Sequence, residues 1–379
     1  MLFSSQVLII VKAQFTTNKV VGKGTGYKRL RKHLKLWVGL VISAVAVWFA
    51  LSGINFGQVG DSFSRLNWWW ILASLIPYFL NLFMKITRWQ LLFSPSPKIR
   101  LGRLWATLNI SYLFNTVLPA RLGEIVRAYA LSRSERISPV RVLSTIFLEK
   151  IMDVMTMFIF LIFLLPFLSL GDDIKQAAFI TGGLVVVAFL VCMLMAAFRK
   201  QSEALVRWVL RIVPSRFREP IFGLVREVLD VLGILLDFKL SLNLWAQSVV
   251  LWLMIVVNYM FVAFALNIPL KFELGMVLLI ALNLGMVVPS APGYIGVFEA
   301  LVKVSLLPFF PGQESMLVSL GLLLHITGYL PVIILGAYYT WAEGLSFGKV
   351  PATPSVEEIS AEAASHHPVE AEPTVSTKK

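Results

Sequence analysis

Two stretches of the sequence decide the fold: Asn115-Thr-Val-Leu-Pro-Ala-Arg-Leu-Gly-Glu124 and Asn283-Leu-Gly-Met-Val-Val-Pro-Ser-Ala-Pro-Gly293. Each stretch begins with an Asn, has a Pro several positions later, and has a Gly four positions after that Pro. Pro and Gly interrupt helices, and each stretch lies inside an otherwise apolar run. Both stretches are therefore predicted to be broken or re-entrant segments.

The composition indicates that a membrane surrounds these segments. Hydrophobic residues make up 58% of the chain and charged residues 15%, and the mean hydropathy is +0.78. Soluble domains are roughly half apolar and about a quarter charged. The net charge of +13 comes largely from basic residues beside apolar runs, which favours anionic lipid head groups over nucleic acid as partners. The single cysteine, Cys192, excludes a disulfide framework and a cysteine metal site.

Long apolar runs recur along the chain and predict an all-α polytopic membrane protein with about six to eight transmembrane helices. The uninterrupted runs lie at about 36–54, 70–89, 142–168, 177–198, 244–266 and 316–341, and the interrupted ones at about 104–120 and 274–310. Basic clusters before the first run and between later runs place both termini in the cytoplasm of a cell-membrane protein. One of these clusters begins with Lys85 and Arg88 and marks a cytoplasmic loop, and Trp89 is expected to be an interfacial anchor.

Three regions are expected: a basic cytoplasmic segment at 1–35, a membrane domain at 36–345 and a disordered tail at 346–379. Residues 201–239 mix basic and apolar positions at helical spacing, which is typical of cytoplasmic or interfacial helices. Breaks are expected there at Pro214 and Pro220.

The two interrupted stretches are also the best pointer to a binding site. The first is flanked by cytoplasmic markers and the second is entered from the outside, as in inverted repeats whose broken helices meet at a central site. Chance similarity between two kinks is the alternative. Unpaired N–H groups at helix starts attract phosphate. Arg121 and Arg127 would reinforce that attraction, and Glu124 can pair with either of them.

Charged residues inside later apolar runs are further candidates. Glu149 and Asp153 share one helix face, and charges near the bilayer middle usually face a cavity or a relay. If the span instead begins at Val154, both residues lie at the interface, and the sequence leaves the two placements open.

Glu299 and Lys303 have i, i+4 spacing in the late half of the chain, which suits a neutralising structural pair as well as a site. His325 stands alone in the last apolar run and is expected to be a packed, hydrogen-bonded residue.

Three features resemble the lysylphosphatidylglycerol synthase transmembrane-region family, which comprises flippase-like integral membrane proteins and includes UPF-type members. They are Pro119-Ala-Arg-Leu-Gly-Glu-Ile-Val-Arg127, the pair Glu149 and Asp153, and Pro289-Ser-Ala-Pro-Gly-Tyr-Ile-Gly-Val-Phe-Glu299. The resemblance covers about residues 34–344. It implies a membrane domain that, in two-domain synthases, flips an aminoacylated phospholipid made by a separate soluble domain, which is not expected here. The late family motif commonly reads Pro-Gly-Gly, whereas Tyr294 follows Gly293 in this chain.

The leading hypothesis is a flippase or transporter of a phospholipid or a polyprenyl-phosphate-linked substrate. The alternative is a non-transporting membrane subunit of a lipid aminoacyl- or glycosyl-transfer system. No nucleotide-binding loop, His-rich metal set or nucleophile motif is found, so no catalytic residue, metal or cofactor is assigned. The expected partners are membrane lipids with anionic or phosphate-bearing head groups, and a homo-oligomer is left open. The candidate substrate-binding residues are Asn115, Pro119, Arg121, Gly123, Glu124, Arg127, Glu149, Asp153, Pro289, Pro292, Gly293, Gly296 and Glu299.

Overall fold

The computed structural model describes residues 50–94, 99–117, 122–167, 172–287 and 291–344, together with residues 45, 47 and 48. Within these ranges every regular element is a helix, which confirms the all-α prediction. The predicted N-terminal segment, most of the first apolar run and the C-terminal tail lie outside the described residues. So do three candidate site residues: Pro119, Arg121 and Pro289.

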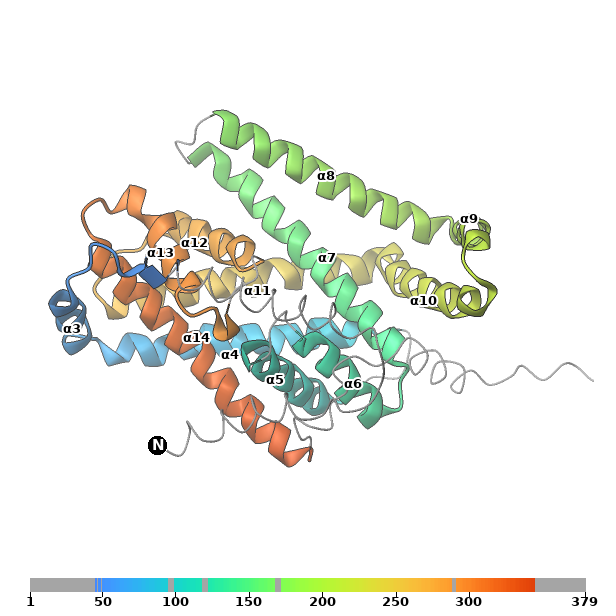
Figure 1. The fold of residues 1–379 in the computed structure, drawn as a ribbon, viewed down its shortest axis with the longest axis horizontal. Coiled ribbons are helices and arrows are strands. Elements are labelled where there is room, and N and C mark those ends of the chain that lie inside the picture. Colours follow the sequence, from blue (N-terminus) through green and yellow to red (C-terminus); the bar gives the residue numbers. More distant parts are fainter. Residues whose placement is uncertain are drawn as a thin grey trace, which may run out of the picture.

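The described chain forms a series of α-helices joined by short turns (Figure 1). The α-helices are α3 (Phe56–Ser64), α4 (Trp68–Leu91), α5 (Leu101–Val117), α6 (Gly123–Glu135), α7 (Pro139–Leu164), α8 (Asp172–Ala197), α9 (Arg199–Val209), α10 (Ser215–Gly233), α11 (Phe238–Ala265), α12 (Phe272–Gly285), α13 (Val297–Leu306) and α14 (Glu314–Ala342). The short 3-10 helices are η2 (Leu165–Phe167), η3 (Leu210–Ile212), η4 (Ile234–Leu236), η5 (Pro292–Tyr294) and η6 (Leu307–Phe309).

Side-chain caps fix the start of several helices. Asn55, Asn67 and Asp237 precede α3, α4 and α11, and each accepts a hydrogen bond from an N–H group of the first turn. Pro139 occupies the first position of α7, where its missing N–H costs nothing and its fixed φ suits the helix.

Four described helices are long and apolar enough to cross a membrane: α4, the Phe179–Ala197 part of α8, α11 and α14. They coincide with four of the predicted runs, so the chain is a polytopic membrane protein. The predicted run at 142–168 corresponds to α7 and η2, but Glu149, Lys150 and Asp153 interrupt the apolar surface of α7.

α4 and α11 lie side by side as an antiparallel pair at the centre of the molecule (Figure 1). The Asn81 side chain donates a hydrogen bond to the Leu251 carbonyl oxygen at 2.5 Å. The Asn258 side chain donates one to the Ser74 carbonyl oxygen at 2.8 Å. The chain therefore runs in opposite directions in α4 and α11.

The helices that follow this pair repeat the same order of lengths. α4, α5, α6 and α7 have 24, 17, 13 and 26 residues, and α11, α12, α13 and α14 have 28, 14, 10 and 29. In each set the two short helices pack together, and the second of them packs on the long helix that follows. Because α4 and α11 are antiparallel, the two sets have the relation expected of an inverted repeat.

α8, α9 and α10 form an outer unit at one side of the molecule (Figure 1). The apolar span of α8 has only 11% of its residues buried. α9 and α10 are separated at Pro214, as predicted, but α10 runs through Pro220, so the break expected there is wrong. Pro220 lies in the second turn, where its missing N–H removes a single helical hydrogen bond.

Candidate functional site

The two interrupted stretches contact each other. Thr116 in the last turn of α5 packs against Gly293 in η5. A Cβ atom added to Gly293 would be in van der Waals contact with the Thr116 methyl group. The two breaks were predicted to meet at a central site, and the contact between the described residues beside them is consistent with that prediction.

Asn115 and Gly123 close the hairpin between α5 and α6. The Asn115 side-chain oxygen accepts a hydrogen bond from the Gly123 N–H at 2.8 Å. A Cβ at Gly123 would collide with the Ser111 carbonyl oxygen, so only Gly allows the two helices to approach this closely. Both residues were predicted to bind substrate, and that role stays a prediction, because their observed contacts hold the hairpin.

The second break is built from residues in a left-handed backbone conformation. Pro292 opens η5, and Gly293, Tyr294 and Gly296 follow with φ values of +74°, +57° and +83°. Tyr294 stands where the resemblance predicts a second Gly, a residue that adopts this conformation without steric cost. A Tyr there is held at a cost of roughly 1–2 kcal/mol.

Glu299 lies in the first turn of α13 and is buried. One of its carboxylate oxygens accepts a hydrogen bond from the Gly296 N–H at 2.8 Å, and the other lies 2.6 Å from Nδ1 of His325 in α14. The Lys303 amine donates to the Ser52 carbonyl oxygen at 2.7 Å. His325 is thus hydrogen-bonded, as predicted, but its partner is a candidate site residue that the sequence did not connect to it.

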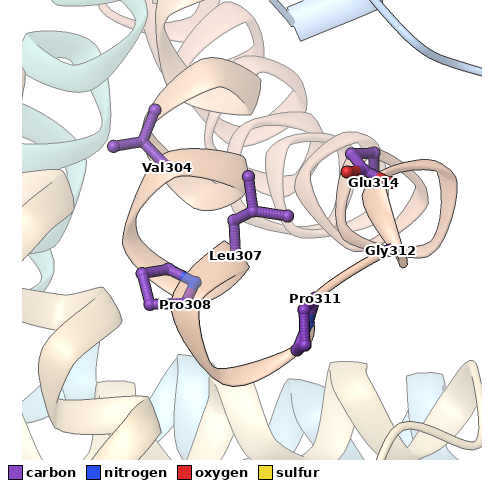
Figure 2. Close-up of a pocket in the computed structure, with 6 residues that line it drawn as sticks. All are labelled: Val304, Leu307, Pro308, Pro311, Gly312 and Glu314. Atoms are coloured by element: carbon purple, nitrogen blue, oxygen red, sulfur yellow. The ribbon is translucent and has the colours of Figure 1, made fainter.

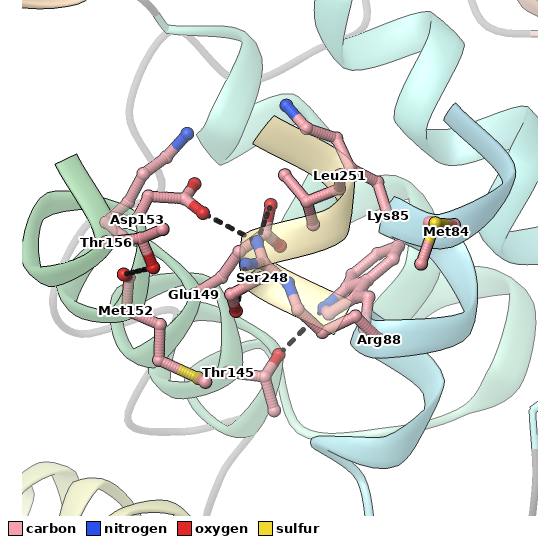
Figure 3. A network of polar contacts seen from close by, with 12 residues as sticks. Met84, Lys85, Arg88, Thr145, Glu149, Met152, Asp153, Thr156, Ser248 and Leu251 are labelled. Carbon is pink, nitrogen blue, oxygen red and sulfur yellow. Dashed lines mark hydrogen bonds and ion pairs between the residues drawn. The ribbon is translucent and has the colours of Figure 1, made fainter. Parts of the chain in front are cut away.

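A cluster of buried charges lies between α4, α6, α7 and α11 (Figure 3). Arg88 of α4 forms an ion pair with Asp153 of α7 at 2.8 Å and donates a hydrogen bond to the Ser248 hydroxyl oxygen at 2.8 Å. Glu149 lies one turn before Asp153, 3.8 Å from the Arg88 guanidinium. Glu149 and Asp153 therefore point into the protein and not toward lipid.

Arg127 of α6 completes the inner part of this cluster. Its Nη2 lies 3.0 Å from Glu149, and its guanidinium carbon lies 3.5 Å from the centre of the Trp89 ring. Arg127 was expected to contact a phosphate. It is instead 1% exposed and paired in this structure, and direct phosphate contact stays a prediction.

The outer part of the cluster reaches the surface of the protein. The Lys150 amine lies 3.0 Å from Glu124, which is also 3.7 Å from Arg127, and the Lys150 side chain is 49% exposed. The Lys85 amine donates a hydrogen bond to the Tyr112 hydroxyl oxygen at 3.0 Å. The charges thus form a continuous path from a half-exposed lysine to a fully buried arginine.

Some guanidinium nitrogens of Arg88 and Arg127 make no hydrogen bond to any described residue. Nε of Arg88, and Nε and Nη2 of Arg127, have no hydrogen-bond partner in the described part of the chain, although all three atoms are buried. The 3.0 Å contact of Arg127 Nη2 with Glu149 is an ion pair whose geometry is too poor for a hydrogen bond. Buried donors normally find a partner, so these atoms mark a place for a further acceptor such as water or a ligand oxygen.

Sequence reasoning missed the contribution of α4 to this cluster. Lys85 and Arg88 were interpreted as markers of a cytoplasmic loop and Trp89 as an interfacial anchor, but Arg88 and Trp89 are both fully buried. Their burial corrects both interpretations. The signal was present, since Asn81, Lys85 and Arg88 have i, i+4, i+7 spacing and form one polar stripe on an apolar helix.

A hollow at the turn between α13 and α14 offers a contrast to the charge cluster (Figure 2). It is lined by Val304, Leu307, Pro308, Pro311, Gly312 and Glu314. Glu314 is its single ionisable lining residue, and none of the lining residues belongs to the charge cluster or to the breaks. We therefore place the candidate site at the charge cluster.

Comparisons with known proteins agree with this architecture. The chain is 24% identical over 287 residues to a UPF0104 membrane protein of Methanothermobacter thermautotrophicus, covering 70% of this chain and 83% of the relative. It is 25% identical over 227 residues to a UPF0104 membrane protein of Methanocaldococcus jannaschii, covering 59% and 91%. It is 22% identical over 335 residues to the glycosyltransferase AglD of Haloferax volcanii, covering 78% of this chain and 52% of that protein.

The sequence profile described as the lysylphosphatidylglycerol synthase TM region matches residues 36–336, which include both interrupted stretches and the whole charge cluster. The chain therefore belongs to the lysylphosphatidylglycerol synthase transmembrane-region family.

Proposed function

We propose that this protein moves a phospholipid or a polyprenyl-phosphate-linked lipid across the cell membrane, with both termini in the cytoplasm. The observation that carries the proposal is the buried charge cluster inside an otherwise apolar helical bundle. Among the described residues it holds four cations and three carboxylates, and therefore one more cation than anions: Lys85, Arg88, Arg127 and Lys150 against Glu124, Glu149 and Asp153.

Stability alone is a weak reason to keep such a cluster. Removing charges from water costs several kcal/mol per ion, and replacing a buried ion pair by well-packed apolar residues is often neutral or stabilising. Charges at membrane depth are by default functional and face a substrate path or a relay. The excess cation, and the Nε atoms of Arg88 and Arg127 that have no hydrogen-bond partner among the described residues, suit a ligand that carries negative charge and several acceptor oxygens.

A phosphate can enter this cluster by exchange. Lys150 is half-exposed and paired with Glu124, so a head-group phosphate at the rim can replace the Glu124 carboxylate as its partner. The next cations inward are Arg127 and Arg88, each already balanced by a carboxylate. Glu124 and Glu149 each have a second cation, Arg127 at 3.7 Å and Arg88 at 3.8 Å respectively, so passing the phosphate from Lys150 to Arg127 leaves neither carboxylate without a partner, which keeps the electrostatic cost low.

The repeated helices supply a means of alternating access. The two breaks meet at Thr116 and Gly293, and the sets α4–α7 and α11–α14 have the relation of an inverted repeat. Transporters of this kind open to either side by rocking one repeat against the other around a fixed site. The acyl or polyprenyl chains stay in the bilayer while only the head group crosses the protein.

The test uses the purified full-length protein in vesicles with a fluorescent phospholipid or a fluorescent polyprenyl phosphate in the outer leaflet. Loss of signal to a membrane-impermeant quencher reports how fast the probe leaves that leaflet. We expect the wild type to move at least one of the two probes. Lys150→Gln should slow movement at least about tenfold, since one charge-assisted bond to phosphate contributes about 1.5–3 kcal/mol.

The matched control is Lys200→Gln, a lysine at the start of α9 outside the cluster. It should leave the rate unchanged. Equal rates for wild type and Lys150→Gln would remove the cluster from the transport path, and no movement of either probe by the wild type would contradict the proposed function.

The second candidate is a non-transporting membrane subunit of a lipid glycosyl- or aminoacyl-transfer system. The similarity to the glycosyltransferase AglD favours it, although this chain covers only 52% of that protein. In that case the protein should bind the polyprenyl-phosphate probe but should not move it from one leaflet to the other. Lys150→Gln should then weaken this binding and have no other effect.

A further inference from the structure

A second buried polar contact joins a broken segment to a long helix, away from the charge cluster. Glu299 in α13 and His325 in α14 are 2.6 Å apart, and their side chains are 7% and 13% exposed. The His325 ring is packed between Phe298, with a centroid distance of 4.8 Å, and Tyr329, with one of 4.4 Å. The pair is therefore held in place within an apolar part of the bundle.

The first repeat holds a different pair at the corresponding junction. There the short helix after the break, α6, is joined to the long helix α7 by Arg127 and Glu149. Arg keeps its proton in proteins, so the charge at that junction is permanent. His is the side-chain type that ordinarily changes its charge between pH 5 and 8. The two repeats thus differ in that one junction has a fixed charge and the other can gain or lose a proton.

The groups around the pair determine what a change in its charge would do. Lys303 lies one turn further along α13 and donates to the Ser52 carbonyl oxygen. The Tyr329 ring of α14 packs on the His325 ring, and the hydrophobic cluster that contains Phe298 also takes in Tyr294 from η5, Tyr259 from α11, Phe63 from α3 and Met286 just after α12. Within this set, the Glu299–His325 contact is the place where a proton lies between two side chains that can each hold it.

The Glu299 carboxylate also couples the pair to the break. Its second oxygen accepts a hydrogen bond from the N–H group of Gly296, the residue directly before α13. Hydrogen bonds to an ionised group are about twice as strong as those between neutral groups. A proton on Glu299 therefore weakens its hold on the start of α13, while loss of the proton strengthens it.

We propose that the Glu299–His325 pair is a proton-binding site and that its loading and unloading couple lipid movement to a proton gradient. A proton from water on one side binds between Oε1 of Glu299 and Nδ1 of His325, α13 shifts against α14, and the proton leaves to water on the other side. Only N–H and O–H bonds form and break, and no other reactant is required. The inference rests on the proposed function and adds its energy source.

The experiment uses the same vesicles with an imposed difference of one pH unit and a pH-sensitive dye trapped inside. If one proton accompanies one lipid, the leaflet ratio of the transported probe should shift about tenfold at steady state, because one pH unit is a tenfold ratio of proton activity. The dye should report proton movement only when the lipid probe is present.

Glu299→Gln and His325→Gln remove the exchangeable proton and keep a hydrogen-bonding side chain. Both variants should lose the tenfold shift and the proton movement, and His325→Gln should still let the probe equilibrate between leaflets. Glu343→Gln is the matched control, because Glu343 follows α14 and pairs with Arg103 at the surface, and it should behave as wild type. A gel-filtration profile like that of the wild type confirms that a variant is folded.

The two proposals fail in different ways. If the wild-type protein moves the probe but its leaflet ratio ignores the pH difference, the proton site is overturned and the proposed function stands. If both Gln variants keep the tenfold shift, coupling occurs elsewhere and the inference is again overturned. If no probe moves under any condition, both proposals fall together.

Discussion

Asn81 in α4 and Asn258 in α11 make the same contact in opposite directions. Each donates its side-chain amide to the carbonyl oxygen about two helical turns before the other Asn, at Leu251 and Ser74 respectively. Such reciprocity is what a two-fold axis between two antiparallel helices produces. The axis passes between α4 and α11, and the broken segments that meet at Thr116 and Gly293 follow these two helices in the chain.

The reciprocity predicts equal effects for two substitutions far apart in the sequence. Asn81→Ala and Asn258→Ala should each lower the free energy of unfolding in detergent by about 0.6–2 kcal/mol, the range of hydrogen bonds between membrane helices. The two bonds lie about two turns apart, so the double variant should lose close to the sum. A large loss for one variant with none for the other would contradict an equivalent role.

The close approach at Gly123 gives a sharper prediction. Gly123→Ala places a methyl group against the Ser111 carbonyl oxygen and the Asn115 side chain, so the α5–α6 hairpin has to open. We expect a loss of about 1–3 kcal/mol, typical of overpacking, and a lower midpoint of thermal unfolding. Gly102→Ala is the control in α5, because nothing lies within 4 Å of its added Cβ and Ala favours helix more than Gly. Equal midpoints for the two variants would show that the hairpin tolerates opening.

The breaks and the apolar spans could be predicted from the sequence because they depend on local chemistry. Pro119, Gly123 and Gly293 mark interruptions whatever the rest of the chain does, and apolar runs of sufficient length predict spans. The partners of the charged groups could not be predicted in the same way. Arg88 and Asp153 are far apart in the sequence, and only the packing of α4 on α7 brings them together. The stripe from Asn81 to Arg88 gave the one local hint, since a polar face on an apolar helix must find partners.

Because the ion pair between Arg88 and Asp153 is buried, we expect the free energy of unfolding to depend strongly on both residues. Asp153→Asn leaves the Arg88 charge, which is fully buried, with Glu149 at 3.8 Å as its remaining carboxylate. We expect each of Asp153→Asn and Arg88→Gln to cost about 3–5 kcal/mol of unfolding free energy, and the double variant to cost less than their sum. Arg199→Gln, which breaks a surface pair with Asp230, should cost about 1 kcal/mol or less. Additive losses in the double variant would mean that the two groups do not act as a pair.

The inverted relation of the two breaks predicts that they are reached from opposite sides of the membrane. Val117 at the end of α5 is 38% exposed, and Val287 after α12 is 70% exposed, so a cysteine at either position can react with a probe. In a chain with Cys192 replaced by Ala, Val117→Cys should react with a membrane-impermeant maleimide from the cytoplasmic side and Val287→Cys from the other side. Labelling of both cysteines from one side would place the two hairpins in the same orientation and rule out the inverted repeat.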